Sequence, residues 1–91
     1  MYFVYVLLNT YKNFYIGYSG DLKKRIKEHK KGFVYATKTK LPIKLIYYEA
    51  SINKYDAYKR EKYLKSGPGK KFLKNRIKEY LKGLGPVRTL V

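Results

Sequence analysis

Cysteine is absent from this sequence of 91 residues, and histidine occurs only once. Without cysteine the chain can form no disulfide framework, no thiolate metal site and no cysteine nucleophile. A single histidine without cysteine also cannot make a structural zinc site. These absences fit a reducing compartment, and we expect the protein in the cytoplasm.

Long apolar runs and nucleotide-binding loops are missing too. No stretch approaches the roughly 18 consecutive apolar residues of a membrane span, and no charged segment followed by a long apolar run marks a targeting signal. The pattern GxxxxGK[ST] does not occur, so we expect no nucleotide cofactor. The sequence therefore predicts an untargeted chain without a membrane partner.

Acidic residues are scarce, since six Asp and Glu stand against 22 Lys and Arg. The formal net charge is +16, which on so short a chain favours a polyanionic partner, with nucleic acid as the first candidate. Two alternatives stay open. One is a membrane surface, although no amphipathic helix with bulky exposed apolar residues supports it. The second is a lysine-rich composition that serves only solubility.

Apolar and aromatic residues are abundant enough for a folded core. Hydrophobic residues make up 45% of the chain and aromatic residues 18%, with twelve tyrosines. This composition is typical of a globular protein rather than a disordered one. The length predicts one domain with a small core, which we place at residues 1–82 with a short tail at 83–91. We expect a monomer.

Residues 1–17 predict a β-hairpin around which the rest of the chain is organised. Two runs of aromatic and β-branched residues, 2–8 and 14–17, flank a polar break that suits a turn. The first run is apolar on both faces. Such a strand belongs in the middle of a sheet that is covered on both sides.

The remaining elements follow from the spacing of apolar residues and from turn residues. A period of 3.6 predicts helices, alternation predicts a strand, and Gly, Pro, Ser and Asn mark the ends. Helix caps are expected from Ser19 or Asp21 and from Asn53. The run Ser-Gly-Pro-Gly at residues 66–69 predicts a hard stop. The predicted elements are a helix at 22–31, a loop at 32–41, a strand at 43–50, and helices at 54–65 and 70–82. Taken alone, these patterns support only a small basic α/β domain.

Arg25 and His29 lie on the inward stripe of the first predicted helix, beside Leu22 and Ile26. Arg25 can be a solvated basic residue whose stem lies on the core. His29 can be a half-buried ring with its hydrogen bonds satisfied. Both can instead face the hairpin across a cleft, because residues four apart share a helix face. The residues alone leave these alternatives open.

Glu61 is a carboxylate on the apolar face of the helix predicted at 54–65. A carboxylate is rarely buried without a partner, because losing its hydration is costly. The partner is either a basic side chain, Arg25 or a lysine, or a divalent cation at the edge of a cleft. Glu49, at the end of the predicted strand, is expected to be structural and to pair with a lysine.

One set of residues recurs in a recognisable order along the chain: Tyr5, Tyr15-Ile16-Gly17, Arg25, His29, Tyr48-Glu49, Arg60-Glu61-Lys62 and Leu64-Lys65. In this order the set resembles the GIY-YIG nuclease family, and most of all its small stand-alone bacterial members. The same domain occurs in the incision subunit of nucleotide excision repair. Two positions depart from the family pattern: Phe3-Val4 replace the Gly-Ile of the first triplet, and the asparagine of a later helix falls on Leu73, with Asn75 as a nearby candidate.

The resemblance implies a fold and a role for each residue. The fold is α/β of the α+β kind, a small three-stranded, mainly antiparallel sheet with the first strand central and helices flanking it. Glu61 would hold a divalent metal, Mg²⁺ or Mn²⁺, and Arg25 would bind the scissile phosphate. Tyr5 would activate or orient water, helped by Tyr15 or His29.

Other residues would support this site. Gly17 would be structural, because glycine in a strand permits a close approach. Basic residues are densest between residues 59 and 82, and residues 37–40 are expected to touch phosphates. The predicted nucleic-acid-binding residues are Lys24, Lys38, Lys40, Lys62, Lys65, Lys70 and Lys71.

One carboxylate, one arginine, one histidine and two tyrosines suit phosphodiester hydrolysis. The resemblance implies a divalent-metal-dependent endonuclease, structure-selective or weakly sequence-specific, that acts on DNA rather than RNA in DNA repair or recombination. The alternative is a non-catalytic basic nucleic-acid-binding module in which Tyr18, Phe33 and Tyr35 stack bases. A small protein of a ribonucleoprotein assembly is a third possibility. Glu61 discriminates, because a pure binder gains nothing from an inward carboxylate that faces a polyanion.

Overall fold

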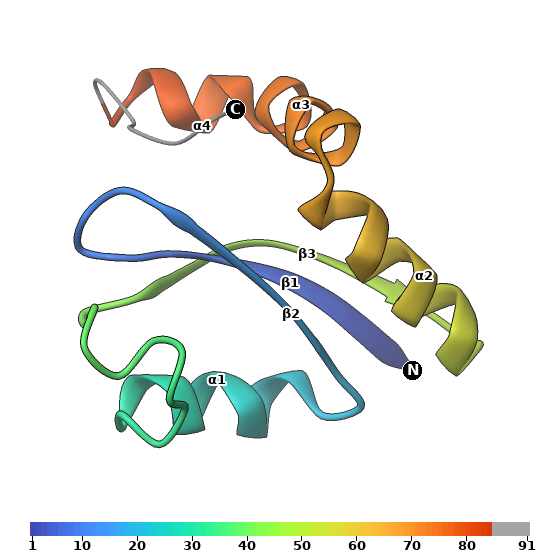
Figure 1. Cartoon of the computed structure of the whole chain (residues 1–91), viewed down its shortest axis with the longest axis horizontal. Coiled ribbons are helices and arrows are strands. Elements are labelled where there is room, and N and C mark those ends of the chain that lie inside the picture. Colours follow the sequence, from blue (N-terminus) through green and yellow to red (C-terminus); the bar gives the residue numbers. More distant parts are fainter. Residues whose placement is uncertain (85–91) are drawn as a thin grey trace.

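The predicted hairpin supplies two strands of a three-stranded antiparallel sheet in the computed structural model, which describes residues 1–84 (Figure 1). The elements are β1 (Tyr2–Leu8), β2 (Phe14–Ser19), α1 (Leu22–Lys30), β3 (Lys44–Ser51), α2 (Lys54–Lys65), α3 (Gly67–Arg76) and α4 (Lys78–Lys82). The strand order β2-β1-β3 puts the first strand in the centre, which confirms the predicted fold class. From residue 85 onward the predicted tail lies outside the described residues.

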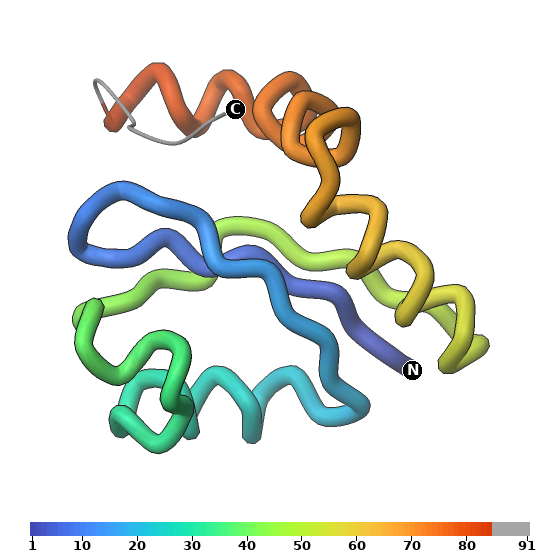
Figure 2. Tube along the Cα trace, in the orientation of Figure 1, coloured from blue at the N-terminus to red at the C-terminus, as the bar shows by residue number. Residues whose placement is uncertain are grey.

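Helices cover both faces of the sheet, with α1 on one face and α2 and α3 on the other (Figures 1 and 2). On the α1 side the buried core contains Tyr5, Leu7 and Ile43. On the other side it contains Leu64 of α2 and Leu73 of α3. The central strand is therefore buried on both faces, as its apolar pattern predicts.

Side-chain caps begin α1 and α2 where the sequence predicts them. The Asp21 carboxylate accepts a hydrogen bond from the Lys24 N–H at the start of α1. At the start of α2 the Asn53 side chain accepts hydrogen bonds from two backbone N–H groups. These bonds satisfy donors that the first helical turn leaves without partners.

The Ser-Gly-Pro-Gly run separates α2 from α3 at Ser66, but its remaining residues already belong to α3. Ser66 is the cap, and its hydroxyl accepts a hydrogen bond from the Gly69 N–H. Pro68 lies in the first turn, where its missing N–H costs nothing. The predicted stop after residue 65 is confirmed, but the predicted start of the last helix at residue 70 is wrong, because turn-forming residues are also favoured at helix starts.

The junction between α2 and α3 is closely packed. A Cβ atom at Gly69 would overlap with the backbone carbonyl of Tyr63, so only glycine fits there.

The second difference from the prediction is an interruption at Ile77, which separates α3 from the short α4. Within residues 1–84 no helix has the length and apolar character needed to cross a membrane.

Glu49 is structural, but its partner is an arginine rather than the predicted lysine. Its carboxylate oxygens accept hydrogen bonds from Arg60, at 2.8 Å from Nε and 2.9 Å from Nη2, and one of them also accepts from the Tyr47 hydroxyl. A guanidinium matches a carboxylate at two points, which an ammonium cannot do. This pair connects α2 to β3.

Candidate active site

Tyr5 on the central strand extends across the edge strand β2. The strand register places Tyr5 directly opposite Gly17. The phenol ring lies over the glycine, where a Cβ atom would overlap with Cζ and Oη of the ring. The absence of a side chain at Gly17 therefore lets the Tyr5 hydroxyl reach α1.

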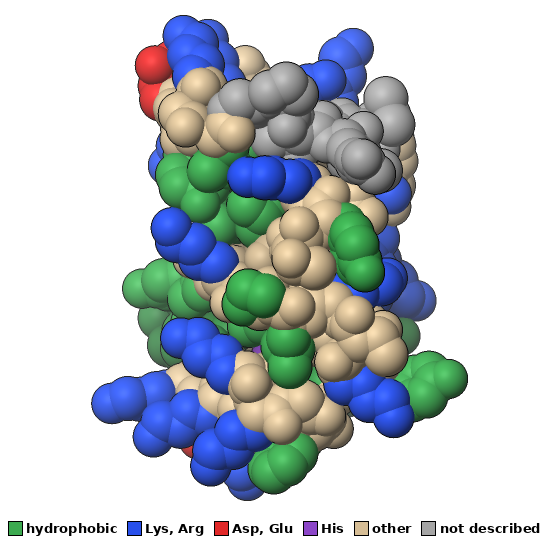
Figure 3. Space-filling model, turned by 90° about the vertical axis from the view of Figure 1, so that its left-hand side faces the viewer, with side chains coloured by type: hydrophobic (Ala, Val, Ile, Leu, Met, Phe, Trp, Pro, Cys, Tyr) green, Lys and Arg blue, Asp and Glu red, His purple; other side chains and the backbone are tan. Residues whose placement is uncertain are grey.

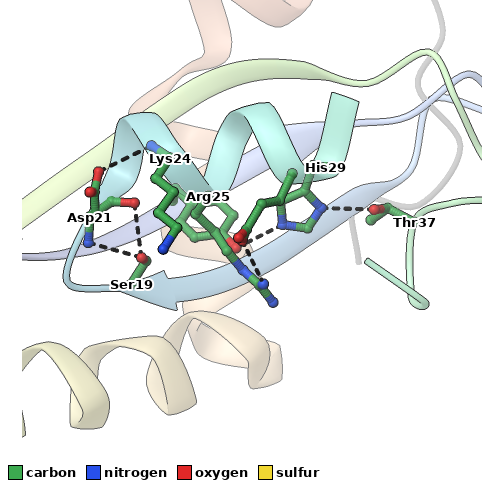
Figure 4. Close-up of polar contacts among 8 residues, drawn as sticks. Ser19, Asp21, Lys24, Arg25, His29 and Thr37 are labelled. Carbon is green, nitrogen blue, oxygen red and sulfur yellow. Dashed lines mark hydrogen bonds and ion pairs between the residues drawn. The ribbon is translucent and has the colours of Figure 1, made fainter. Parts of the chain in front are cut away.

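The hydroxyl of Tyr5 begins a buried chain of hydrogen bonds that passes through His29 to Thr37 (Figure 4). Tyr5 Oη lies 2.8 Å from His29 Nε2, and His29 Nδ1 lies 2.7 Å from Thr37 Oγ1. All three side chains are buried. The prediction of a phosphate contact is wrong at Thr37, because its hydroxyl faces His29 inside the fold.

Arg25 lies beside the Tyr5 hydroxyl and acts to lower the pKa of Tyr5. A neutral imidazole has one N–H group and one acceptor nitrogen. The His29 ring therefore donates to one of the two hydroxyl groups and accepts a hydrogen bond from the other.

Burial keeps both rings neutral. Burial, followed by the positive charge of Arg25, lowers the pKa of His29 to about 4. Burial also raises the pKa of Tyr5 to about 12, although the hydrogen bond from Arg25 acts in the opposite direction. At neutral pH the pair therefore consists of a phenol and an uncharged imidazole.

Arg25 lies at the surface end of this network. Its Nη1 atom is 3.1 Å from the carboxylate of Glu28, one turn further along α1. The hydrogen bond with Tyr5, and that with Glu28, raise the pKa of Arg25. The guanidinium is thus held in place beside a polar hollow that an anion can enter. The lining residues of this hollow are Tyr18, Ser19, Asp21, Lys24, Arg25 and Glu28.

Glu61 approaches from the other side of the sheet, on α2. Its side chain is only 14% exposed, and its Oε2 atom lies 3.0 Å from Nζ of Lys65, one turn further along the helix. The negative charge of Glu61 contributes to the raised pKa of Tyr5, so the carboxylate is within electrostatic reach of the buried chain. Of the partners that the sequence left open, the structure contains a lysine.

A metal site built from several protein ligands is not present in the described part of the chain, because no three His, Cys, Asp or Glu side chains of residues 1–84 converge. The single carboxylate of Glu61 still fits Mg²⁺ or Mn²⁺, since a hard divalent ion keeps several waters and takes oxygens from substrate phosphates. Lys65 is exposed, so its ammonium can move into solvent when a cation replaces it. The donor set suits a metal shared with the substrate.

Tyr15 is the other predicted site residue that the structure brings to this network. Its half-buried ring lies 5.1 Å from the His29 ring and 6.3 Å from the Tyr5 ring, between centroids. Asn75, in contrast, is exposed on α3. Leu73, where the resemblance placed an asparagine, is fully buried in the core.

Most of the lysines predicted to bind nucleic acid are exposed. Lys24 lines the hollow beside Arg25, whereas Lys65 is engaged with Glu61. On the face shown in Figure 3, Lys and Arg side chains outnumber those of Asp and Glu. Of the remaining predicted residues, Lys38, Lys40, Lys62 and Lys71 are exposed and Lys70 is half-buried.

Two residues of the site were not predicted as members of it. Glu28 could have been found, because it follows Arg25 by three positions on a helix, where opposite charges pair. Thr37 could not, since it lies in a segment without periodicity. Its contact with His29 depends on how that segment folds against α1.

Comparison with known proteins gives this arrangement a family context. A family model described as the GIY-YIG catalytic domain matches residues 1–72. A UPF0213 protein of Clostridium perfringens is 39% identical over 66 residues, which cover 71% of each chain. A UPF0213 protein of Pediococcus acidilactici is 33% identical over 92 residues, which cover 97% of this chain and 88% of that one. The solution NMR structure of a UPF0213 protein from Bacillus halodurans shows 31% identity, covers 93% of this chain and 86% of that one, and has a TM-score of 0.46.

Proposed function

This chain belongs to the GIY-YIG family, among its UPF0213 proteins, and on that premise we propose that it is a divalent-metal-dependent endonuclease that hydrolyses DNA phosphodiester bonds. The observation that carries the proposal is the position of Arg25. Its guanidinium is held by Tyr5 on one side and by Glu28 on the other, and it faces the polar hollow. A phosphate bound there would meet a cation that needs no rearrangement.

In the proposed reaction a water attacks the scissile phosphorus and the bond to the leaving oxygen breaks. Arg25 would donate hydrogen bonds to non-bridging oxygens and balance the negative charge that grows in the transition state. Its planar group can bind two oxygens at once, which also fixes the orientation of the phosphate.

Glu61 would hold the divalent ion, Mg²⁺ or Mn²⁺, together with waters and substrate oxygens. When bound, such an ion stabilises negative charge on the phosphate and on the leaving oxygen. Glu61 would have to exchange its present partner, Lys65, for the ion. The released ammonium would then be available for a phosphate further along the strand.

The two tyrosines would have different tasks. Tyr5 is buried and hydrogen-bonded to His29, so we assign it the positioning of Arg25 rather than direct contact with the attacking water. Tyr15 is half-buried beside it, and its hydroxyl would orient that water. His29 would hold Tyr5 in place, and as a neutral ring it adds no charge to the site.

The proposed cleavage is structure-selective or only weakly sequence-specific. The chain has 22 lysine and arginine residues against six acidic ones, and such groups bind the phosphate backbone, which carries no sequence information. Structure-selective cleavage is needed in DNA repair and recombination, where the shape of a junction identifies the substrate.

A second candidate function is a non-catalytic nucleic-acid-binding module. The observation that favours it is the ion pair between Glu61 and Lys65, because a carboxylate with a lysine partner does not need a metal. The exposed rings of Phe33 and Tyr35 would then stack bases. Both functions predict binding that weakens steeply with salt, so only a cleavage assay separates them.

Cleavage of single-stranded, duplex, flap and branched DNA with Mg²⁺ or Mn²⁺ tests the proposal. Glu61→Gln removes the charge that would hold the metal. Glu79→Gln is its control, because Glu79 also pairs with a lysine of its own helix, Lys82, but lies exposed on α4. We expect Glu61→Gln to cut at least about 100-fold more slowly than the wild type. Glu79→Gln should cut at the normal rate, and chelation of the metal by EDTA should abolish cleavage.

Binding of the same DNAs, measured without metal, completes the test. Glu61→Gln should bind at least as tightly as the wild type, because the substitution removes a negative charge that repels the phosphates. If the wild type binds every substrate but cuts none with either metal, the enzyme proposal fails and the binding module remains. If Glu61→Gln cuts as fast as the wild type, Glu61 is not the metal ligand.

A further inference from the structure

A pocket of aromatic rings lies between β2 and α2. It is lined by Tyr18 of β2 and by Lys54, Tyr55 and Tyr58 of α2, and the surface exposed inside it is apolar. We call it the tyrosine pocket. Tyr55 is 67% exposed and Tyr58 is 47% exposed, so these rings are not part of the core. Exposed apolar groups that gather at one place mark a binding surface more often than scattered ones do.

Two of the three rings that line this pocket, those of Tyr18 and Tyr58, contact each other. The rings of Tyr2 and Tyr18 are parallel with centroids 6.5 Å apart, and the ring of Tyr58 meets that of Tyr18 edge-on at 6.4 Å. Such contacts fix the orientation of aromatic side chains. The side of the pocket that Tyr18 and Tyr58 form is therefore in place before a ligand arrives.

The tyrosine pocket shares one lining residue with the candidate active site. Tyr18 lines both the pocket and the polar hollow beside Arg25. Tyr58 precedes Glu61 by three positions on α2, and residues at that spacing share a helix face. A strand whose phosphate lies at Arg25 would thus have its neighbouring nucleotide beside the pocket.

Positive charge surrounds the rings. Lys54 is part of the lining, Nζ of Lys62 lies 4.7 Å from the centroid of the Tyr58 ring, and Lys24 lines the adjoining hollow. Aromatic rings flanked by lysines match a nucleic-acid strand, because its bases have flat π faces and its phosphates are anionic. An apolar protein segment would match the rings but would leave the lysines without counter-charges.

We propose that the tyrosine pocket stacks an unpaired nucleobase next to the scissile phosphate. A base inside a duplex cannot enter, because neighbouring base pairs cover both of its faces. The substrates would be strands with an unpaired nucleotide at the cleavage point, such as flaps, bulges and overhangs. This inference rests on the proposed function in that nucleic acid is the substrate, but it concerns binding and does not require cleavage.

Fluorescence anisotropy with labelled oligonucleotides, in the absence of metal, tests the inference. The three probes are a duplex with a thymidine flap, the same flap with abasic residues that keep only sugar and phosphate, and the fully paired duplex, each made as DNA and as RNA. The test variant is Tyr55→Ala with Tyr58→Ala. Tyr35→Ala is the matched control, because Tyr35 is also exposed and has Nζ of Lys38 5.0 Å from its ring centroid. Circular dichroism confirms that each variant folds.

We expect the double variant to bind the flap on the order of 5- to 100-fold more weakly than the wild type, as for one stacked base. The affinity of the wild type should fall by the same factor when the flap is abasic. The double variant should bind the abasic flap and the thymidine flap with equal affinity. Binding of the paired duplex should not change. Tyr35→Ala should bind like the wild type, and Phe at both pocket positions should restore binding.

Equal losses on flap and paired duplex would overturn the inference, because the tyrosines would then act on the backbone or on the fold. Undiminished binding of the flap by the double variant would overturn it too. The same holds if the wild type binds the abasic flap as tightly as the flap with bases, both in DNA and in RNA. Base-dependent binding to DNA or to RNA supports it. These outcomes are independent of the proposed nuclease activity. Base-dependent binding without cleavage would support the base-stacking pocket and contradict the endonuclease. Cleavage without base-dependent binding would support the endonuclease and contradict the pocket.

Discussion

The buried histidine makes the stability of this fold depend on pH. In an unfolded chain histidine titrates near pH 6.5, whereas burial and the charge of Arg25 lower the pKa of His29 to about 4. Between these two values the unfolded state binds a proton that the folded state does not bind. Stability that is present above about pH 6.5 is therefore lost progressively as the pH falls toward 4.

The size of this effect follows from the two pKa values. Between about pH 7 and pH 5, His29 should remove about 2 kcal/mol from the free energy of unfolding, at roughly 1.4 kcal/mol per pKa unit. That loss corresponds to a shift on the order of 1 M in the urea midpoint. Glu49 contributes little in this window. Burial acts to raise its pKa, but the hydrogen bonds and charge of Arg60 lower it, so its stabilisation is lost only at more acidic pH.

Urea denaturation followed by circular dichroism at a series of pH values measures the effect. The comparison is with His29→Gln, which cannot take up a proton and keeps an amide between Tyr5 and Thr37. The wild type should lose about 2 kcal/mol more than this variant between about pH 7 and pH 5. Other groups that titrate in the range are common to both proteins and cancel in the difference.

Equal losses in the two proteins would refute the reasoning, because the pH dependence would then come from groups other than the histidine. A direct measurement is the NMR titration of the His29 ring in the folded protein, which should have its midpoint near pH 4. A midpoint near 6.5 would also contradict the reasoning, since it would mean a hydrated ring rather than one held between two hydroxyl groups.

Three further predictions concern the fold and its charge. Thr37→Val should lower the free energy of unfolding by about 1 to 3 kcal/mol at neutral pH, because His29 Nδ1 stays buried without its hydrogen-bond partner; urea denaturation measures the loss, and Thr37→Ser should restore most of it. Gly69→Ala should lower the melting temperature far more than Gly67→Ala, since a Cβ at Gly69 overlaps with the Tyr63 carbonyl whereas one at Gly67 meets nothing within 4 Å. The affinity for duplex DNA should fall with salt at a log–log slope of about −0.9 per neutralised phosphate, which titrations at several NaCl concentrations measure.

The parts of the fold that the sequence predicts correctly are those fixed by local patterns. Residues 2–8 are apolar on both faces, and this property predicts the central strand that the structure contains. The helix after Asn53 has its predicted bounds because its cap and its periodicity agree. At residues 66–69 the local pattern is ambiguous, since the same residue types end one helix and begin the next. Only the contact of Gly69 with the preceding helix explains why a glycine is needed there.

In the candidate site, too, the features that follow from local sequence patterns could be predicted and those that depend on the fold could not. Arg25 and His29 could be assigned to one face of a helix because the spacing of four residues decides it. The burial of Tyr5 follows from the predicted central strand, but the sequence could not show that Tyr15 is only half-buried, because that depends on the place of β2 at the edge of the sheet. It also could not choose the partner of Glu61, because a lysine one turn away and a metal ion both satisfy a carboxylate.

The pairing of Tyr5 with Gly17 explains why two short triplets, distant in sequence, act as a single unit. The phenol can extend from the central strand to α1 only if the residue opposite it on the edge strand has no side chain. Its hydroxyl is then hydrogen-bonded to His29 and lies beside Arg25, so a residue in the middle of the sheet helps to position a surface guanidinium. Replacing the glycine would therefore displace Arg25 through the ring of Tyr5, without removing any group proposed to touch the substrate.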